Sequence, residues 1–464
     1  MKIVISARRF HPPLVGGVDV YAERLIHALE RLGHDISVIS YDSSAKNKDK
    51  GIEIVEDEYE GNKVWRLSFD LDQRPKGTFQ HAYDPEMGEF VKKILQAEKP
   101  DLLIVMNFYL ATLATVEVAK ELGLPVLHIA TDFIPVCRRA TFIQWDGKSC
   151  ERGEGIKSCS ACYVSHHVAG RVMAKVFDRF PEETLLNWAK KDTFNTPINP
   201  YALMRPYWKQ VRIMKERIKT LRPLRGRIDL VFAPTKFTHD VFLANGFLKE
   251  QVYLLPFSVE SDNPLASVEH VPAEHTRFLF IGRLQPYKGA HLLVEAFNNL
   301  KLPKGATLTI YGTNDGYEDY FDRLMKMINS NKQIRFSGKI PPEELHRAFS
   351  EADYFVLPST WHENSPLIIL DALQSRTPVI ASDVGGVNDL VENGKNGILF
   401  PMGDHLALQG VLQQVIDRPE LLSKLRNGID LLDIDKYTRR ILQLCEERGI
   451  LSNTSAAVRK GVTQ

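Results

Sequence analysis

Two carboxylates flank the predicted start of a helix in the segment Ser359–Asp371, which reads STWHENSPLIILD. Glu363 precedes the helix, and Asp371 lies within it, eight residues later. At about 1.5 Å per helical residue this spacing is roughly 12 Å, so the two groups cannot share a proton. The spacing predicts that they hold opposite ends of an elongated polar ligand. The alternative for Asp371 is an ordinary exposed helix acid.

The residues between these carboxylates have the features of an anion site. Pro366 suits the first turn of a helix, and Asn364 or Ser365 suits its cap. The backbone amides that follow, near Leu367, then lack partners within the helix and attract negative charge. We therefore expect the charged middle of the ligand at this helix start.

A second segment, Ile281–Gly289 (IGRLQPYKG), also joins a predicted strand to a predicted helix. Arg283 offers a forked donor for phosphate oxygens, and Lys288 offers a mobile point charge. Gly282 and Gly289 permit close approach of the backbone. The segment therefore predicts phosphate binding, with two solvated charges as the alternative.

Gly16 and Gly17 precede the first predicted helix. They allow a ligand to approach the backbone, but the segment does not match the dinucleotide-binding pattern GxGxxG. On their own they are as consistent with a simple turn as with a ligand site.

Four of the five cysteines fall within 26 residues of one another. They are Cys137, Cys150, Cys159 and Cys162. The closing Cys-x-x-Cys fits chelation of one tetrahedral ion, and four thiolates suit zinc or an iron–sulfur cluster. The spacings match neither a standard zinc ribbon nor a ferredoxin. We predict a structural metal centre, with unpaired buried thiols and disulfide or redox use as alternatives.

The stretch 201–228 contains nine basic residues and one acid, Glu216, which gives a local charge of +8. The basic residues are Arg205, Lys209, Arg212, Lys215, Arg217, Lys219, Arg222, Arg225 and Arg227. Apolar side chains and the aromatic residues Tyr207 and Trp208 interleave with them. This pattern predicts peripheral contact with an anionic membrane or a lipid-linked acceptor. The alternative is a solvated helix that covers the first domain.

The whole chain has the composition of a soluble globular protein. It has 464 residues, a net charge of +1 and 44% hydrophobic residues, which suggests two or three domains and argues against disorder. It is not basic enough overall for a nucleic-acid coat, so nucleic acid is not expected as a partner. No segment reads as a transmembrane helix, and the apolar run Ile3–Ile5 is too short for a signal peptide. We expect a cytoplasmic protein, with peripheral contact at the inner face of the cell membrane as a further option.

Two separate alternations of strands and helices predict an α/β fold with two Rossmann-like, doubly wound domains that face a cleft. The predicted strands are 2–6, 35–40, 102–106, 126–130, 277–281, 307–311, 333–337, 354–357 and 378–381. The predicted helices are 19–32, 291–300, 317–329, 342–351 and 367–375. The predicted domain plan is a first domain 1–255 with an insertion over about 133–227, a linker 256–275, a second domain 276–415, helices 416–452 that cross back, and a flexible tail 453–464.

Taken together, these motifs resemble the GT-B glycosyltransferases, specifically the retaining nucleotide-sugar enzymes of glycosyltransferase family 4. The matching segments are Gly16–Gly17 with Gly33–Asp35, Ile281–Gly289, the E-x7-E-like Glu363–Asp371, and Ser382–Val387. Some bacterial members of the family are also similar around the cysteines, where Asp146–Cys150 precedes Cys-x-x-Cys.

The resemblance implies roles for individual residues. Arg283 and Lys288 would neutralise the donor diphosphate, and Glu363 would hold the donor sugar. The implied donor-binding residues are Gly16, Gly17, Gly282, Asn364, Ser365, Pro366, Leu367 and Asp371. No cofactor is implied for catalysis, and no metal is implied at the diphosphate.

Two positions depart from the family pattern. Asp371 stands where the family usually has Glu, so its implied contact with the ribose has a shorter reach. Thr131-Asp132 stands where the family often has His-Asp, with His128 three residues before Thr131. Asp132 is therefore the candidate for positioning the sugar or the acceptor.

We thus expect a retaining glycosyltransferase that moves a sugar from a UDP- or GDP-linked donor. The expected acceptor is a saccharide or a lipid-linked saccharide in surface polysaccharide or glycoconjugate synthesis. One alternative is a nucleotide-sugar epimerase of GT-B fold. A second is a non-catalytic, metal-stabilised binding module.

Overall fold

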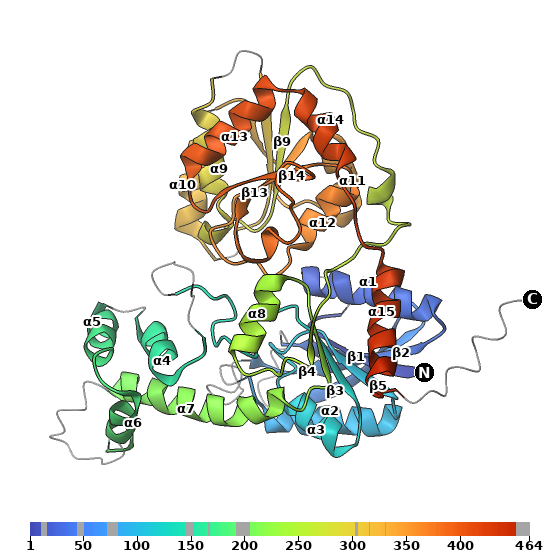
Figure 1. Ribbon diagram of the computed structural model, residues 1–464, viewed down its shortest axis with the longest axis vertical. Helices are drawn as coiled ribbons and strands as arrows, with labels where there is room; N and C mark the ends of the chain where they lie inside the picture. Colours follow the sequence, from blue (N-terminus) through green and yellow to red (C-terminus); the bar gives the residue numbers. More distant parts are fainter. Residues whose placement is uncertain are drawn as a thin grey trace, which may run out of the picture. The chain divides into compact units, whose positions relative to one another are not determined.

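The computed structural model describes residues 1–10, 16–43, 51–71, 82–144, 150, 153–165, 168–191, 205–301, 305–314, 316–329 and 331–451. The chain forms two α/β units (Figure 1). The first comprises Met1–Pro234, Thr238–Leu255 and the chain from Thr438 onward, and the second comprises Thr235–Phe237 and Pro256–Tyr437. Each unit has its own twisted, largely parallel sheet, so the prediction of two Rossmann-like domains is confirmed.

The sheet of the first unit has eight strands in the order β3-β4-β2-β1-β5-β6-β7-β8. The strands are β1 (Lys2–Ala7), β2 (Asp35–Asp42), β3 (Glu53–Tyr59), β4 (Asn62–Ser68), β5 (Leu102–Val105), β6 (Val126–Ile129), β7 (Leu230–Ala233) and β8 (Val252–Leu254). Three central strands read LLIV, VLHI and LVFA and are buried along their whole length. Such continuous apolar runs are typical of parallel strands covered on both faces.

The hairpin of β3 and β4 is the antiparallel exception, and the sequence analysis did not predict it. Its turn residues Glu60 and Gly61 both have positive φ, which is the geometry of a tight two-residue hairpin turn. Strand β3 (EIVEDEY) lies at the edge of the sheet and is mostly exposed. Its charged residues suit an edge strand but hide the alternation by which a strand is recognised.

Helices fill the connections of the first unit. They are α1 (Gly17–Arg31), α2 (Pro85–Glu98), α3 (Ala114–Glu121), α8 (Lys236–Ala244) and α15 (Ile434–Glu447). Helix α2 shows why such a helix begins where it does: the Asp84 side chain accepts hydrogen bonds from the amides of Glu86 and Met87, and Pro85 occupies the first turn. Helices α8 and α15 each begin with residues of the second unit and continue in the first.

A separate group of helices lies between β6 and β7, within the range predicted as an insertion. It consists of α4 (Ile156–Val164), α5 (Val168–Phe177), α6 (Glu182–Lys191) and α7 (Arg205–Arg225). The shorter helices gather along the first half of α7 (Figure 1). They enclose a small core of their own around Leu185, Trp208 and Val211.

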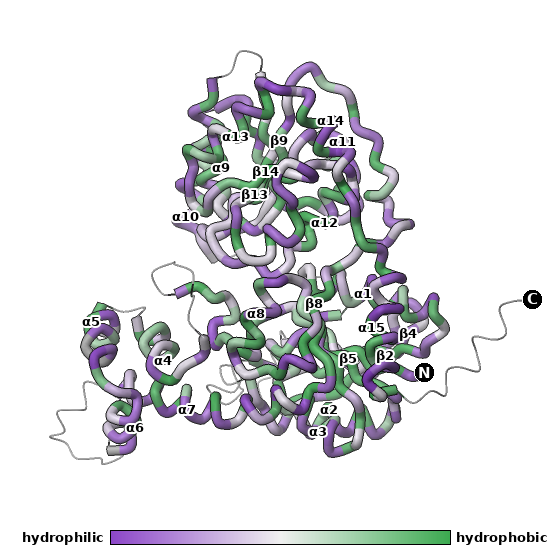
Figure 2. The backbone as a smooth tube through the Cα atoms, viewed as in Figure 1, coloured by the Kyte–Doolittle hydropathy of each residue, from purple (hydrophilic) through white to green (hydrophobic). Residues whose placement is uncertain are grey.

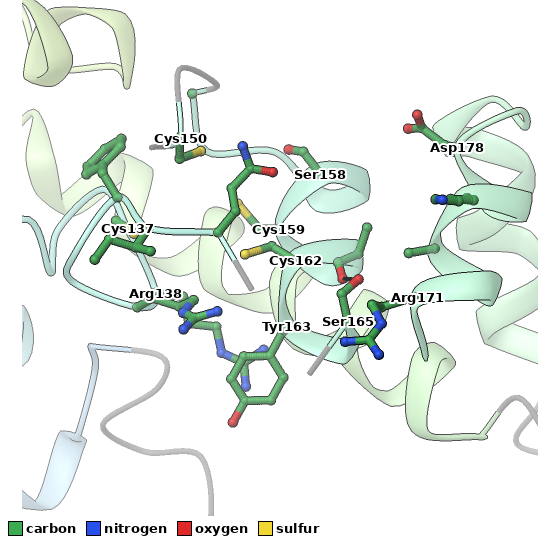
Figure 3. Close-up of a pocket in the computed structure, with 18 residues that line it drawn as sticks. Cys137, Arg138, Cys150, Ser158, Cys159, Cys162, Tyr163, Ser165, Arg171 and Asp178 are labelled. Atoms are coloured by element: carbon green, nitrogen blue, oxygen red, sulfur yellow. Dashed lines mark hydrogen bonds between the residues drawn. The ribbon is translucent and has the colours of Figure 1, made fainter. Parts of the chain in front are cut away.

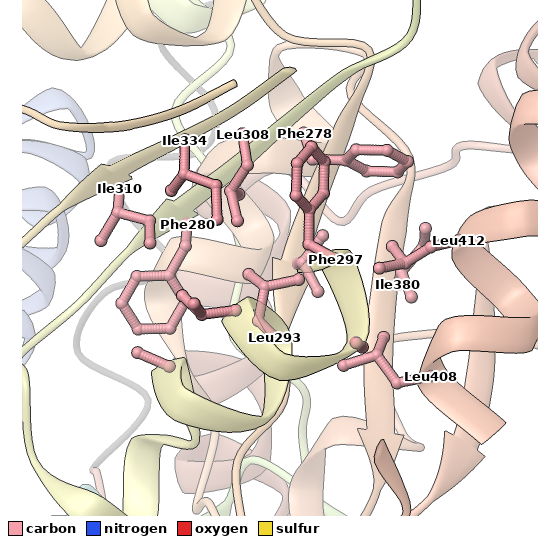
Figure 4. Packing of buried hydrophobic residues seen from close by; sticks show 14 of the residues in the cluster. Phe278, Phe280, Leu293, Phe297, Leu308, Ile310, Ile334, Ile380, Leu408 and Leu412 are labelled. Atoms are coloured by element: carbon pink, nitrogen blue, oxygen red, sulfur yellow. The ribbon is translucent and has the colours of Figure 1, made fainter. Parts of the chain in front are cut away.

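The second unit contains a six-stranded, all-parallel sheet in the order β11-β10-β9-β12-β13-β14. Its strands are β9 (Arg277–Ile281), β10 (Thr307–Tyr311), β11 (Ile334–Phe336), β12 (Tyr354–Leu357), β13 (Val379–Asp383) and β14 (Gly397–Pro401). Its helices are α9 (Ala290–Asn298), α10 (Glu318–Asn329), α11 (Leu345–Ser350), α12 (Leu367–Gln374), α13 (His405–Asp417) and α14 (Glu420–Asn427), with short 3-10 turns η4 (Pro264–Ser267), η5 (Pro286–Lys288), η6 (Pro342–Glu344) and η7 (Gly385–Val387). Phe278 and Phe280 of β9 meet Leu293 and Phe297 of α9 in its core (Figure 4).

Two expected boundaries differ in the structure. Residues 256–275 belong to the second unit, where the amides of Val259 and Val271 bond to carbonyls of Leu432 and Ser350, so this stretch is not a free linker. Helix α14 also stays in the second unit, and only from Thr438 does the chain belong to the first. The predicted flexible tail, 453–464, lies outside the described residues.

Hydrophobic residues are concentrated in the strands, whereas hydrophobic and hydrophilic residues alternate along the helices (Figure 2). Among the residues that the structure describes, no helix has both the length and the apolar character needed to span a bilayer.

Candidate active site

The predicted donor-site residues of the second unit lie where the strand order of its sheet reverses. Strands β9 and β12 pair directly, with Phe278 opposite Tyr354. The loop after β9 carries residues 282–289, and the loop after β12 carries residues 358–366. Open α/β sheets bind ligands at the carboxyl ends of such strands, because the two connections leave toward opposite faces. The fold therefore brings the two motifs of the sequence to one edge.

An ion pair joins the two loops at this edge. Lys288 Nζ lies 2.7 Å from Glu363 Oε1, and the exposed fractions of the two side chains are 15% and 6%. Ser359 Oγ donates to the same oxygen at 2.7 Å. The Lys288 ammonium also lies 5.0 Å from the centre of the Trp361 ring. Both partners are thus held in position by contacts within the protein.

This arrangement leaves bonding capacity for a ligand. An ammonium has three N–H donors, and Lys288 uses one of them on Glu363. Within the described chain, both of these hydrogen bonds to Glu363 go to Oε1, so Oε2 remains as an acceptor. Arg283 lies on the same loop as Lys288, and its side chain is exposed.

Glycines let the loops of this edge pack against one another. Gly289 has φ +74, and a Cβ there would lie 1.8 Å from the carbonyl oxygen of Pro358. A Cβ on Gly386 would lie 1.7 Å from the carbonyl oxygen of Asn364. Gly289, which the sequence analysis assigned to ligand approach, is therefore required first by loop packing. Gly282 is less confined, since its Cβ would come no closer than 3.3 Å to the Phe280 ring.

Helix α12 begins one residue later than the cap prediction requires. Pro366 itself occupies the N-cap position, in extended conformation and with no side-chain cap hydrogen bond. The prediction that Asn364 or Ser365 caps the helix is therefore wrong, because a capping side chain must directly precede the helix. The consequence favours a ligand: the amides from Leu367 onward have no side-chain cap. Ser365 Oγ is buried nearby with no hydrogen-bond partner among the described residues.

Asp371 lies in the middle of α12. It is only 9% exposed, so the alternative of an ordinary exposed helix acid is wrong. Asp371 and Glu363 are therefore joined through α12, which begins shortly after Glu363 and contains Asp371.

Asp132 lies at the corresponding edge of the first unit. It follows β6, and its carboxylate accepts hydrogen bonds from the amides of Phe108 at 3.1 Å and Ile134 at 2.7 Å. Burial raises the pKa of Asp132 to about 6, although these amides and the charges of Arg8 and Arg217 oppose the shift.

Arg8 is a neighbour of Asp132 that the sequence analysis missed. It directly follows β1, and its guanidinium lies 4.8 Å from the centre of the Tyr109 ring. The strand order of the first sheet reverses between β1 and β5, so this is again a switch point. A polar residue immediately after the first strand of a parallel sheet was the signal that could have identified Arg8.

His128 does not replace the histidine that the family pattern has next to Asp132. It is buried in β6, with Nδ1 2.9 Å from the carbonyl oxygen of Val105 and rings of Phe108 and Phe242 beside it. Burial lowers its pKa to about 4, so the imidazole is neutral at pH 7. It is a core residue.

Gly16 and Gly17 lie at the start of α1, and both are exposed. Gly16 is extended (φ −162, ψ 171), and a Cβ there would meet nothing closer than 3.9 Å. The described fold therefore has no steric need for glycine at position 16. Residues 11–15, which precede it, lie outside the described part of the chain.

The four clustered cysteines line a single cavity of the first unit (Figure 3). Cys137 lies in the loop after β6, and Cys159 and Cys162 lie on α4. Burial raises the pKa of the Cys159 thiol to about 12, and the pKa of Cys137 is also raised by burial.

The structure corrects the interpretation of the basic stretch. Tyr207 and Trp208, expected at a membrane surface, are buried at 3% and 1% exposure in the core of the inserted helices. Arg217 and Arg225 are buried as well, with Nε and Nη2 at 2.7 and 2.5 Å from the carboxylate of Glu154. The apolar and aromatic residues form the inward stripe of α7, which the count of charges alone could not reveal. Residues 201–204 lie outside the described chain.

Two family models match the chain, one in each unit. The model described as "Glycosyl transferase 4-like domain" matches residues 16–172, and the model described as "Glycosyl transferases group 1" matches residues 266–429. The first range contains Gly16, Gly17, Asp132 and the four cysteines. The second contains Arg283, Lys288, Glu363 and Asp371.

Curated relatives are similar over part of the chain. The D-inositol 3-phosphate glycosyltransferase of Corynebacterium efficiens is 30% identical over 169 residues, which is 35% of this chain and 39% of the relative. The amylovoran biosynthesis glycosyltransferase AmsK of Erwinia amylovora is 26% identical over 208 residues, 43% of this chain and 50% of the relative. The chain thus matches between about two fifths and half of the length of these relatives.

Solved structures are similar over nearly the whole chain. Sucrose-phosphate synthase of Thermosynechococcus elongatus has a TM-score of 0.63 at 16% identity and covers 96% of this chain and 98% of its own. Anabaena HepE in complex with UDP and glucose has a TM-score of 0.61 at 16% identity and covers 96% of this chain and 100% of its own. At these identities the likeness shows a shared fold.

Proposed function

Because the chain belongs to the GT4-like glycosyltransferases with the GT-B fold, we propose that it transfers a sugar from a nucleotide-sugar donor to a saccharide acceptor. The observation that carries this proposal is the ion pair of Lys288 and Glu363, which lies just before the uncapped start of α12. A fixed cation, a free carboxylate oxygen and open helix amides suit a ligand that joins a diphosphate to a sugar.

In the proposed complex the donor diphosphate lies against the start of α12. Arg283 and Lys288 supply positive charge, and amides from Leu367 onward supply N–H donors. Glu363 Oε2 accepts from a hydroxyl of the donor sugar, and Asp371 binds the ribose. Gly282, Asn364, Ser365 and Pro366 complete the donor side, and Gly16 and Gly17 offer backbone to the ligand. Two cations and a helix terminus would meet the charge of the leaving diphosphate without a metal ion.

We propose that the sugar keeps its anomeric configuration. The acceptor hydroxyl would attack on the face from which the phosphate leaves, and a phosphate oxygen would take its proton. Glu363 accepts hydrogen bonds from both Lys288 and Ser359, which suits a role in holding the donor sugar. Asp132, in the first unit, is proposed to position the sugar or the acceptor.

The proposed acceptor is a saccharide, free or lipid-linked, in the synthesis of a surface polysaccharide or glycoconjugate. The name of the Erwinia relative, which refers to amylovoran biosynthesis, supports this class. UDP- and GDP-linked donors are both proposed, and HepE has been solved with UDP. A cytoplasmic location remains a prediction. So does membrane contact, which now rests only on the exposed cations of α7, such as Arg205, Lys209 and Lys219.

Titration of the full chain with UDP and with GDP tests the donor site. We expect Arg283→Ala and Lys288→Ala each to weaken binding of the preferred nucleotide by at least about tenfold, which is about 1.4 kcal/mol. Lys424→Ala, which removes an exposed lysine of α14 in the same unit, is the matched control and should bind like the wild type. Equal affinity in all four proteins would remove the donor-site assignment.

Product analysis distinguishes transfer from the epimerase alternative. With donor alone, an epimerase converts the sugar of the nucleotide-sugar, whereas a transferase gives at most slow hydrolysis. Incubation of the wild type with candidate donors and analysis of the sugar released would decide between them. Conversion of the donor sugar without an acceptor would contradict the proposed function.

A further inference from the structure

The four clustered cysteines surround one cavity although they come from three separate segments. The cavity has a volume of about 260 Å³, and its lining includes Cys137, Cys150, Cys159 and Cys162. None of the four forms a disulfide and all are partly buried, whereas the fifth cysteine, Cys445, lies in α15 and does not line the cavity. Figure 3 shows the four residues around this space. Four thiols without disulfides around one cavity are the ligand set of a metal centre.

The turn after Cys137 is held in an unusual backbone conformation. The Ala140 amide bonds to the Cys137 carbonyl oxygen at 2.9 Å, and Ala140 and Phe142 adopt positive φ values of 60 and 51, which non-glycine residues rarely do. Such conformations persist only where the surrounding structure holds them, and they gather at functional sites. The strained turn here directly follows a cysteine that lines the cavity.

The remaining ligands are placed by α4 and the segment before it. Cys159 and Cys162 are three residues apart on α4, so they lie on one face of the helix. The amide of Cys150 bonds to the carbonyl oxygen of Phe142 at 2.6 Å, which ties it to the Cys137 turn. The loop and the helix therefore present two pairs of sulfur atoms to the same cavity.

The charges around the cavity favour an anionic centre. Its charged lining residues comprise four cations and one acid, namely Arg138, Arg139, Arg171, Lys175 and Asp178. Four thiolates around a zinc ion or a [4Fe–4S] core carry a net charge of about −2. A cationic lining offsets such a charge in a partly buried site.

The spacing of the sulfur atoms favours a cluster over a single zinc ion. A tetrahedral zinc–thiolate site with bonds of about 2.3 Å holds its sulfur atoms about 3.8 Å apart. Among the described residues, no three cysteine sulfurs lie within 4.8 Å of one another. A cluster keeps its ligands further apart, because inorganic iron and sulfide lie between them. We propose that Cys137, Cys150, Cys159 and Cys162 bind an iron–sulfur cluster through four thiolates.

The cluster would fix the loop that holds Asp132. The Ile134 amide donates to the Asp132 carboxylate, and the Ile134 carbonyl oxygen accepts a hydrogen bond from Arg217. The Cys137 amide donates to the carbonyl oxygen of Phe133. The chain from Asp132 to Cys137 is thus one bonded turn with a sulfur ligand at its end. The role is structural, and it is independent of nucleotide binding in the second unit.

Metal analysis of the full chain purified without oxygen tests the proposal. We expect iron and acid-labile sulfide in equal amounts, with visible charge-transfer absorption that closed-shell zinc cannot give. Cys137→Ser and Cys162→Ser should lose most of the iron and the absorption. Cys445→Ser is the matched control and should keep both.

Other outcomes overturn the proposal. Near-stoichiometric zinc without iron would replace the cluster with a mononuclear site. Absence of both metals, with the four thiols open to alkylation or joined in disulfides, would remove the metal centre. If the serine variants do not fold, the metal content of the wild type still decides. Nucleotide titration of the same preparation separates this result from the proposed function.

Discussion

The ion pair of Lys288 and Glu363 is largely buried, which is unusual for two charged side chains. Largely buried ion pairs seldom repay the cost of removing two charges from water. This pair lies at the carboxyl edge of a sheet, where it spans two loops and is backed by Ser359 and Trp361. The position of the pair is therefore more consistent with the proposed binding role than with a gain in stability.

The protonation of Asp132 should affect how the free energy of unfolding depends on pH. Its pKa is 3.8 in an unfolded chain and about 6 in the folded protein. Between these values the folded protein binds more protons, so the free energy of unfolding falls as pH rises. The stabilising effect of the neutral carboxyl is complete below the unfolded pKa and lost above about 6.

We therefore predict a pH-dependent difference between the wild type and Asp132→Asn. From about pH 3.5 to about pH 7 the wild type should lose up to about 3 kcal/mol of stability relative to the variant. Parallel urea unfolding of both proteins across this range measures it. Two curves that stay parallel with pH would show that Asp132 titrates normally.

At the scale of elements, the strand order places both sets of polar residues. Each sheet has a switch point in its strand order, between β1 and β5 in the first unit and between β9 and β12 in the second. Arg8 and Asp132 follow strands at or beside the first switch point, and Arg283 and Glu363 follow strands at the second. The same rule of topology therefore accounts for both edges.

Glu154 anchors the longest inserted helix. Its carboxylate, 3% exposed, pairs with Arg217 and Arg225 of α7, which are each 1% exposed. Arg225 also donates to the carbonyl oxygen of Asn245 at 2.8 Å. Removal of the single acid would leave two buried guanidinium groups without their shared counter-charge.

We predict that Glu154→Gln lowers the stability of the first unit by about 3 to 5 kcal/mol. Thermal unfolding and proteolysis near α7 measure the loss. Glu351→Gln, which removes the acid of an exposed pair with Arg347, is the control and should melt like the wild type. A Glu154→Gln protein as stable as this control would mean that the two arginines do not depend on the carboxylate.

At the scale of the whole molecule, the proposed roles divide between the units. Diphosphate binding rests on the second unit, and Asp132 belongs to the first. The charge also divides unevenly: the net +1 of the chain includes +8 over residues 201–228, which leaves −7 elsewhere. Two of those nine cations, Arg217 and Arg225, are buried in ion pairs with Glu154. The exposed basic patch is therefore smaller than the sequence suggests.

This division predicts separable effects. Asp132→Asn should bind UDP or GDP as the wild type does, because the substitution lies in the unit that does not bind the nucleotide. It should transfer sugar at least about tenfold more slowly, because Asp132 is proposed to position the sugar or the acceptor. Arg283→Ala should lose nucleotide affinity. Nucleotide titration and turnover measured on the same preparations test both. Loss of nucleotide affinity in Asp132→Asn would show that the roles are not divided by unit.

Local sequence pattern was sufficient to predict the elements that are buried on both faces. Apolar runs such as Arg277–Ile281 and Tyr354–Leu357 became strands with the predicted bounds, since continuous burial on two faces leaves a clear signal. The positions of Arg283, Lys288 and Glu363 after those strands predicted that the three residues lie on neighbouring loops, as the structure shows. The charged β3–β4 hairpin gave no such signal and was missed.

What each side chain faces depends on long-range packing, which the sequence pattern does not reveal. Tyr207 and Trp208 could lie outward or inward by composition, and the packing of α4 to α6 against α7 turned them inward. Asn364 and Ser365 could cap a helix by type, and the backbone at Pro366 placed them too early to do so. Burial and partners depend on segments far apart in the chain, so local sequence fixes which groups are available, and long-range packing fixes which of them meet.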